Sequence, residues 1–254
     1  MSKESVETNE TGSSSSSVFT KLILGDSLVW QPEVPIDVII TDPPYALDKN
    51  GNMLGHLSQN FKEKGSHMRG YIDNDRKTYK AFLDSFFATS YDLLPENGLL
   101  LSFMGNRTAD QLLSAGTDNG FTLMDIIVFA GGSSFAKSQT TLAPRHELCS
   151  FFRKEGSPKR KINKSWKTKN VYSSPKTKEA KLHPTGKPLD WMDFLIETFS
   201  LPGETVYDPF AGSGTTLFSA RRAGRNSIGV EKDPAYYSEA RMILEKDQSA
   251  LFWA

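Results

Sequence analysis

The chain has 254 residues and equal numbers of acidic and basic side chains, so its formal net charge at pH 7 is zero. This length suits one large α/β domain with insertions, and the neutral balance gives no global attraction to nucleic acid. A single cysteine excludes a disulfide framework. No apolar run is long enough to span a membrane, and the first residues lack the pattern of a secretory signal. We therefore expect a protein of a reducing, cytoplasmic compartment.

Polar residues dominate the first part of the chain. Residues 1–19 include a run of five serines, which predicts a disordered tail ahead of a single domain at residues 20–254. Strands are predicted at residues 21–24, 37–41, 98–104, 121–130, 146–153, 204–207 and 226–230. Helices are predicted at residues 77–94, 108–119, 189–200, 217–224 and 234–246. This alternation predicts an α/β fold with a doubly wound, mostly parallel seven-stranded sheet, in which the strand at 146–153 is antiparallel.

The first chemically distinctive segment is Asp42-Pro43-Pro44-Tyr45, which follows an apolar run at residues 38–41. Consecutive prolines lack the N–H groups that a sheet ladder needs, so the strand ends here. The segment then offers a carboxylate, carbonyl oxygens and a flat aromatic ring, which together suit an exocyclic amine on a planar base. A capped turn with a core tyrosine explains the same four residues equally well.

A second segment, residues 208–216, reads Asp-Pro-Phe-Ala-Gly-Ser-Gly-Thr-Thr and lies between a predicted strand and a predicted helix. This arrangement lets a nucleoside-type ligand approach the backbone at a helix N-terminus. Thr215 stands where a phosphate-binding loop needs lysine, and the glycine spacing of a dehydrogenase is absent, so the loop favours a cofactor without a pyrophosphate. Glu231 ends the next strand, where an acidic residue holds ribose hydroxyls. It equally suits the N-terminal charge of the helix that follows.

Together with His183-Pro184-Thr185-Gly186-Lys187-Pro188, these two segments resemble the DNA amino-methyltransferases that act on adenine N6 or cytosine N4. The resemblance covers roughly residues 20–247, although the family usually carries glutamine where this chain has Gly186. The order of the segments, with Asp42 first, resembles the family's permuted beta arrangement. The resemblance implies a Rossmann-like methyltransferase fold, in which the strands before Asp42 and Asp208 are neighbours. It also implies S-adenosylmethionine as the cofactor.

The resemblance further implies the site residues. The catalytic set is Asp42, Pro43, Pro44 and Tyr45. Asp42 and the Pro43 carbonyl accept hydrogen bonds from the N–H groups of the amine, and Tyr45 stacks on a base flipped out of the duplex. The amine then attacks the sulfonium methyl group directly. For Asp26, capping of its own loop is as good an explanation as a cofactor contact. The implied cofactor-binding residues are Asp26, Thr185, Lys187, Asp208, Pro209, Phe210, Ala211, Gly212, Ser213, Gly214, Thr215 and Glu231.

Two long segments interrupt the alternation of strands and helices. Residues 46–76 directly follow Tyr45 and are placed to close over a flipped nucleotide. Residues 153–181 carry eleven basic and two acidic side chains in a chain that is neutral overall. This concentration favours a surface that follows DNA phosphates, although charge runs are also typical of solvated loops. The predicted DNA-binding residues, in the interval that holds the target-recognition region of the resembled family, are Lys159, Arg160, Lys161, Lys164, Trp166, Lys167 and Lys169.

We predict methylation of adenine N6, because Asp42 stands where cytosine-N4 members more often carry serine. Cytosine-N4 methylation stays an alternative, as does a catalytically silent nucleic-acid-binding protein with a relic cofactor fold. DNA is the expected partner, in a bacterium or a phage-infected bacterial cell and within a restriction–modification system, and a homodimer stays an open alternative to a monomer. No metal is expected, since the four histidines are scattered. Cys149 is expected in the core rather than as a nucleophile.

Overall fold

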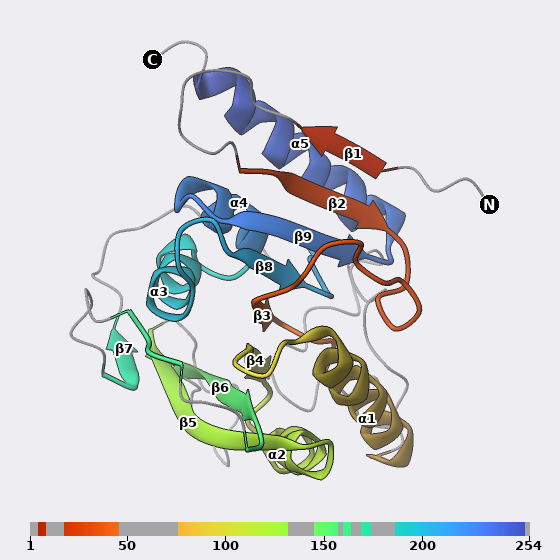
Figure 1. Ribbon diagram of the computed structural model, residues 1–254, viewed down its shortest axis with the longest axis vertical. Helices are drawn as coiled ribbons and strands as arrows, with labels where there is room; N and C mark the ends of the chain where they lie inside the picture. Colours follow the sequence, from red (N-terminus) through yellow and green to blue (C-terminus); the bar gives the residue numbers. More distant parts are fainter. Residues whose placement is uncertain are drawn as a thin grey trace, which may run out of the picture.

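A computed structural model of the protein describes residues 5–8, 18–45, 76–131, 145–156, 160–163, 169–173 and 186–251. These residues form one sheet with helices packed on it (Figure 1). The strands are β1 (Ser5–Thr8), β2 (Thr20–Leu24), β3 (Val38–Thr41), β4 (Leu99–Met104), β5 (Phe121–Ala130), β6 (His146–Lys154), β7 (Val171–Ser173), β8 (Thr205–Asp208) and β9 (Asn226–Glu231). The helices are α1 (Arg76–Leu93), α2 (Ala109–Asp118), α3 (Leu189–Phe199), α4 (Thr215–Arg222) and α5 (Pro234–Leu251).

The strands lie in the order β1-β2-β9-β8-β3-β4-β6-β5-β7. β2, β9, β8, β3 and β4 are parallel, while β6 is antiparallel to both of its neighbours, β4 and β5. The strands from β2 to β5 in this order are the seven that the sequence predicts, and β6 is the expected antiparallel strand. Strand order reverses between β8 and β3, because β9 follows β8 on one side and β4 follows β3 on the other. Ligands of open α/β sheets bind at such a reversal.

The sheet extends beyond the prediction at both edges. β1 pairs with β2 in antiparallel register, so Ser5–Thr8 forms an edge strand within the segment predicted as a disordered tail. β7 pairs in parallel with β5 and lies inside the segment predicted as a basic insertion. A sheet edge presents N–H and C=O groups that a short extended segment can satisfy. Within the described residues the sheet has nine strands instead of the predicted seven, because neither short segment has the apolar pattern on which strand prediction rests.

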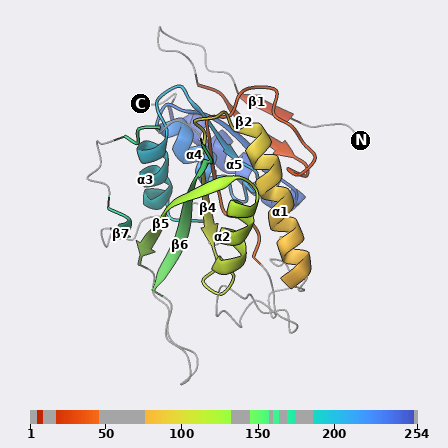
Figure 2. The ribbon, with the colours of Figure 1, turned by 60° about the horizontal axis from the view of Figure 1, so that its bottom comes forward.

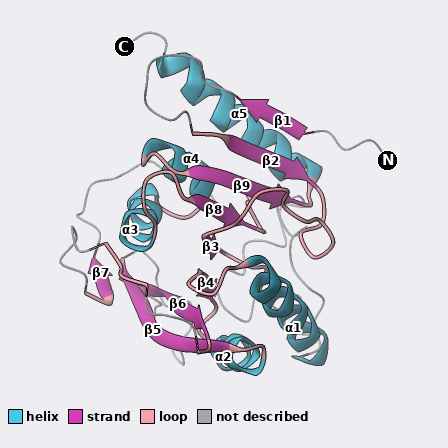
Figure 3. Ribbon diagram, in the orientation of Figure 1, coloured by secondary structure: helices cyan, strands magenta, loops and turns pink. Residues whose placement is uncertain are grey.

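Helices cover both faces of the sheet. α1 and α2 pack on one face, and α3, α4 and α5 pack on the other (Figures 2 and 3). Successive side chains of a strand alternate between faces, so Ile39 belongs to the core with Phe86 of α1, whereas Val38 and Ile40 belong to the core with Leu195 of α3. Burial of β3 on both sides explains its continuous apolar run. None of the helices within the described residues has the length and apolarity needed to cross a membrane.

The pairing of β3 with β8 positions the site. Val38 lies opposite Val206 and Ile39 opposite Tyr207, in parallel register. The carboxyl ends of both strands therefore meet at one edge of the sheet, where Asp42 follows β3 and Asp208 ends β8. The expectation that these two strands are neighbours at the reversal of strand order is confirmed.

Candidate active site

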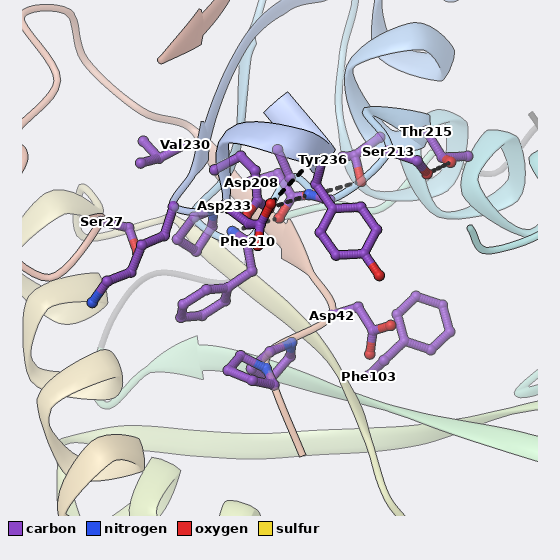
Figure 4. A pocket seen from close by; sticks show the side chains of 18 of the residues that line it. Ser27, Asp42, Phe103, Asp208, Phe210, Ser213, Thr215, Val230, Asp233 and Tyr236 are labelled. Atoms are coloured by element: carbon purple, nitrogen blue, oxygen red, sulfur yellow. Dashed lines mark hydrogen bonds between the residues drawn. The ribbon is translucent and has the colours of Figure 1, made fainter. Parts of the chain in front are cut away.

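A cavity of about 430 Å³ opens at the carboxyl edge of the sheet, within the size range of small-ligand sites. The segments after β2, β3, β8 and β9 line it, together with residues of α1, β4, α3 and α5 (Figure 4). In Figure 4, Asp42 and Phe103 lie on one side of the pocket and Asp208 and Ser213 on the other. The predicted site residues that line this one cavity are Asp26, Asp42, Pro43, Pro44, Tyr45, Lys187, Asp208, Pro209, Phe210, Ala211, Gly212, Ser213, Thr215 and Glu231.

Two predicted cofactor residues are not among the lining residues. Gly214 is the N-cap of α4 and has a φ of 78°, a left-handed conformation that glycine adopts without strain. A Cβ atom on Gly214 would lie 3.2 Å from the Cβ of Ala240 in α5. Glycine here therefore lets the loop turn close against α5. Thr185 lies outside the described residues.

The carboxylate of Glu231 organises one end of the cavity. It accepts hydrogen bonds from the Gly212 N–H at 2.8 Å and from the Asp233 N–H at 2.7 Å. Burial raises the pKa of Glu231 above its usual value, although the backbone N–H groups oppose this effect. One carboxylate thus joins the glycine-rich loop to the segment after β9, and its remaining lone pairs are available to vicinal hydroxyls. The contact with the Asp233 N–H agrees with a role at the start of the helix that follows, and the contact of Glu231 with ribose hydroxyls stays a prediction.

Asp208 is buried, and its carboxylate is held by the protein itself. Thr41 Oγ1 donates to Oδ1 and Thr216 Oγ1 donates to Oδ2, each at 2.6 Å, and the Phe210 N–H also donates to Oδ1 at 3.1 Å. Burial raises the pKa of Asp208 to about 6, against these three hydrogen bonds. The side chain therefore connects the end of β3 with the first turn of α4, and it shapes the cofactor loop from within.

Asp26 faces the same end of the cavity. Its carboxylate accepts a hydrogen bond from the Leu28 N–H at 3.1 Å and pairs with the Lys232 ammonium at 2.7 Å. Burial by itself would raise the pKa of Asp26, but these two contacts outweigh it and lower the pKa. Asp26 thus caps its own loop and also lines the cavity. The ion pair with Lys232 links the segments after β2 and β9.

The Asp42 carboxylate lies at the other end, within reach of two side chains. The Tyr45 hydroxyl donates to Oδ1 at 2.5 Å, and the Lys187 ammonium lies 2.9 Å from Oδ2. About a third of the Asp42 side chain stays exposed, so the carboxylate still opens into the cavity. Burial, followed by the charge of Asp42, raises the pKa of the Tyr45 phenol well above its ordinary value. Tyr45 is therefore a neutral hydrogen-bond donor to Asp42.

Lys187 is a buried cation between two acids. Its Nζ lies 2.5 Å from Glu147 Oε2 as well as 2.9 Å from Asp42 Oδ2, and 4.5 Å from the centre of the Phe103 ring. Burial alone would lower the pKa of Lys187, but the carboxylates of Asp42 and Glu147 outweigh it and raise the pKa well above the usual value. The sequence predicts Lys187 as a cofactor residue, whereas the structure places its ammonium against the predicted catalytic carboxylate.

Several lining residues have no signal in the sequence. Phe82 lies in α1 beside the core residues Leu83 and Phe86, yet it lines the cavity with its ring centre 5.6 Å from that of Phe210. Phe103 lies in β4, whose six residues are all buried, so its pattern indicates only a core strand. Tyr236 stands in the first turn of α5 and closes the cavity from the side. Pattern analysis misses all three because cavity-lining and core aromatics look alike.

The predicted DNA-binding set divides in the structure. The Arg160 guanidinium is largely buried, forms an ion pair with Glu204 and also donates to the backbone carbonyl of Phe199, so these contacts occupy it inside the fold and do not support its predicted role in DNA binding. Lys161 and Lys169 are exposed. Lys159, Lys164, Trp166 and Lys167 lie outside the described residues, as does the segment 46–75.

Cys149 is fully buried in β6, where burial raises the pKa of its thiol, so the expectation of a core cysteine is confirmed.

The charge of the cavity indicates the ligand that it suits. Five carboxylates outnumber two ammonium groups among the lining residues, which favours a ligand that carries positive charge. Residues 208–216 contain no lysine or arginine, so a pyrophosphate would find no counter-charge in the loop. The acids are Asp26, Asp42, Asp208, Glu231 and Asp233, and the bases are Lys187 and Lys232.

The family model of the N6/N4 DNA methylases matches residues 36–242, which include both ends of the cavity. The chain belongs to this DNA methylase family. It is 25% identical to the type II methyltransferase M.HindIII of Haemophilus influenzae over 279 aligned positions, which cover 84% of this chain and 90% of that one. The prediction of an amino-methyltransferase of the N6/N4 family is thereby confirmed.

Solved structures of DNA methylases share the fold. The crystal structure of the complex of M1.HpyAVI with SAM superimposes with a TM-score of 0.59 at 25% identity, covering 82% of this chain and 89% of that one. The cytosine-N4-specific PvuII DNA methyltransferase gives a TM-score of 0.68 at 20% identity, covering 88% and 86%. Both agree with the Rossmann-like methyltransferase fold that the sequence predicts.

Proposed function

We propose that the protein transfers a methyl group from S-adenosylmethionine to the exocyclic N6 amine of adenine in DNA. One observation carries the proposal: a single cavity runs from Glu231 and Asp26 to Asp42 and Tyr45. A methyl donor held at the first end and a flipped base held at the second would meet inside this cavity. Membership of the N6/N4 DNA methylase family supports the reaction class.

The described residues fit S-adenosylmethionine. Glu231 offers carboxylate lone pairs to the ribose hydroxyls, and the rings of Phe210 and Tyr236 offer flat apolar contacts to the adenine. The surplus of carboxylates suits a sulfonium cation. S-adenosylmethionine supplies an electrophilic methyl group on that sulfonium, and the complex of M1.HpyAVI with SAM shows that a related fold accepts this cofactor.

Asp42 prepares the amine for attack. An exocyclic amine is a weak nucleophile because its lone pair is conjugated with the ring. In the proposal, the Asp42 carboxylate and the Pro43 carbonyl accept hydrogen bonds from the two N–H groups of the amine, which draws the nitrogen toward tetrahedral geometry and frees the lone pair. The nitrogen forms its bond to the methyl carbon as the carbon–sulfur bond breaks, with that electron pair staying on sulfur. The nitrogen then releases one proton through Asp42 to water.

Adenine is the preferred base on account of Asp42 itself, since the resembled cytosine-N4 enzymes more often carry serine at this position. For DNA contact we propose the exposed Lys161 and Lys169, together with Lys159, Lys164, Trp166 and Lys167 of the same basic segment. Electrostatic attraction to phosphates is independent of sequence. These residues would therefore hold the duplex while Tyr45 stacks on the extruded base.

Incubation of the protein with methyl-labelled S-adenosylmethionine and duplex DNA, followed by digestion to nucleosides and chromatography, tests the proposal. We expect the label in N6-methyldeoxyadenosine. Label in N4-methyldeoxycytidine would overturn the choice of adenine, and label only in RNA or protein substrates would overturn DNA as the substrate. Absence of S-adenosylmethionine binding would favour the catalytically silent alternative.

A further inference from the structure

Three charged groups lie in contact at the carboxyl edge of the sheet, and two of them, Asp42 and Lys187, line the cavity. Asp42 follows β3, Lys187 precedes α3, and Glu147 lies near the start of β6. The Lys187 ammonium lies 2.9 Å from Asp42 Oδ2 and 2.5 Å from Glu147 Oε2. Only 12% of the Lys187 side chain is exposed, against 34% for Asp42 and 25% for Glu147. The cation is therefore the buried centre of the cluster, and Asp42 is the member most open to the cavity.

We infer that Lys187 and Glu147 are positioning residues for amine methylation, which set the orientation and the charge of Asp42 without touching the substrate. The inference rests on the function proposed above. Lys187 holds Oδ2 of Asp42 while the Tyr45 hydroxyl holds Oδ1, so the carboxylate cannot rotate freely and its exposed part stays toward the cavity. Glu147 occupies the far side of the ammonium. The Phe103 ring, 4.5 Å from Nζ, covers the cation from a third side.

Charge balance gives Glu147 its importance. During methyl transfer, positive charge moves from the sulfonium to the amine nitrogen beside Asp42. Asp42 and Lys187 alone would be a neutral pair, which gives little electrostatic stabilisation to that positive charge. With Glu147 the cluster carries one net negative charge, and a fixed negative charge in a water-poor site stabilises developing positive charge. With Glu147 present, Lys187 can orient Asp42 while the cluster keeps its net negative charge.

Charge-altering variants of the cluster test the inference. Glu147→Gln makes the cluster neutral, and we expect kcat to fall about 10- to 100-fold while the KM for S-adenosylmethionine changes far less. Lys187→Met leaves two carboxylates facing each other, so one of them retains a proton and the acidic limb of the kcat profile moves to higher pH. The double variant restores one net negative charge, and we expect it to be more active than either single variant. Glu147→Asp, which keeps the charge, should recover part of the lost kcat.

Further titratable groups among the described residues face Asp42 and Lys187 and bear on the pH profile. Tyr45 and Cys149 also interact with Lys187, and Tyr79 and Asp208 also interact with Asp42. All four are unchanged in the variants, so the shift between variants isolates Lys187 and Glu147.

A matched control and the wild-type enzyme separate the possible failures. Lys80 also lies between two acids, Asp84 at 2.9 Å and Asp118 at 3.5 Å, but on the exposed side of α1 and α2, so Lys80→Met should keep wild-type kcat. Each variant is first checked for cooperative unfolding and for S-adenosylmethionine binding by calorimetry. A double variant whose loss equals the product of the single losses, with wild-type enzyme active on DNA, would overturn the inference. A wild-type enzyme that methylates no DNA would instead overturn the proposed function on which it rests.

Discussion

Thr41 Oγ1 donates a hydrogen bond to Asp208 Oδ1 at 2.6 Å, and this contact joins the strand that carries Asp42 to the loop that lines the opposite end of the cavity. Thr41 immediately precedes Asp42, and both hydrogen-bonding groups are buried. The second oxygen of Asp208 accepts from Thr216 of α4. One buried carboxylate therefore keeps the two ends of the proposed active site in register.

Thr41→Val should weaken this connection. Valine keeps the shape of threonine but leaves a buried carboxylate oxygen with one hydrogen bond fewer, which typically costs about 1–3 kcal/mol. Urea unfolding should show this loss in the free energy of unfolding. Thr117→Val is the matched control, because the Thr117 hydroxyl bonds only to backbone carbonyls on the exposed side of α2. Equal stabilities of the two variants would contradict the importance of the Thr41 contact.

The raised pKa of Asp208 predicts a specific pH dependence of stability. Its pKa is about 6 in the folded protein, against about 3.9 in an unfolded chain, so between these values the folded state binds more protons. The free energy of unfolding contributed by Asp208 is therefore highest below pH ~4 and is lost as pH rises to about 6. Asp208→Asn removes this titration. The difference in unfolding free energy between wild type and variant, followed across this window, should change with pH; a constant difference would contradict the raised pKa.

Glu231→Gln tests the cofactor end of the cavity. The substitution keeps the size of the side chain but removes the negative charge of the carboxylate. That carboxylate accepts hydrogen bonds from two backbone N–H groups and, in the proposal, from the ribose hydroxyls. Hydrogen bonds to charged groups contribute about 1.5–3 kcal/mol, so calorimetry should show at least a tenfold weaker affinity for S-adenosylmethionine. Glu245→Gln is the control, since Glu245 forms an exposed pair with Arg241 on α5. Unchanged affinity in Glu231→Gln would exclude Glu231 from the cofactor site.

Substitution of Arg160 should lower the stability of the fold, whereas substitution of Lys161 and Lys169 should weaken DNA binding. Removal of one partner of a buried ion pair costs about 3–5 kcal/mol, so Arg160→Met should lower the free energy of unfolding far more than Arg241→Met, whose exposed pair contributes at most about 1 kcal/mol.

Lys161→Ala with Lys169→Ala should instead leave the free energy of unfolding unchanged. The double variant should weaken DNA binding and reduce the slope of log K against log salt by about 1–2. An unchanged slope would remove both lysines from the DNA surface.

The strands and helices of the central fold could be predicted because their local patterns agree with their environment. β3 and β4 are buried on both faces and are mostly apolar, with Thr41 and Ser102 as their polar residues, and Gly224 ends the turn after α4 at a φ of 73°. β1 and β7 could not be predicted, because three- or four-residue edge strands are stabilised by pairing with β2 and β5 rather than by an apolar pattern.

The site was predictable where chemistry is concentrated in short segments, and not where it depends on pairs distant in sequence. Asp42 and Asp208 are evident from their neighbours in the chain. The contact of Lys187 with Glu147 joins residues 40 positions apart, and only the fold reveals it. The sequence likewise counts Arg160 as a DNA-binding cation, because the buried position of Glu204 beside it has no local signal.

Asp42→Ala offers the most direct test of the central claim, that Asp42 activates the amine of a base in a cavity shared with the cofactor. The variant removes the carboxylate at the base end and leaves Glu231, Asp26 and the glycine-rich loop intact. Methyl transfer from labelled S-adenosylmethionine to DNA should be measured by nucleoside analysis, beside calorimetric binding of the cofactor. We predict N6-methyldeoxyadenosine from the wild-type protein, none from Asp42→Ala, and cofactor binding by both. Wild-type transfer by Asp42→Ala would contradict the account.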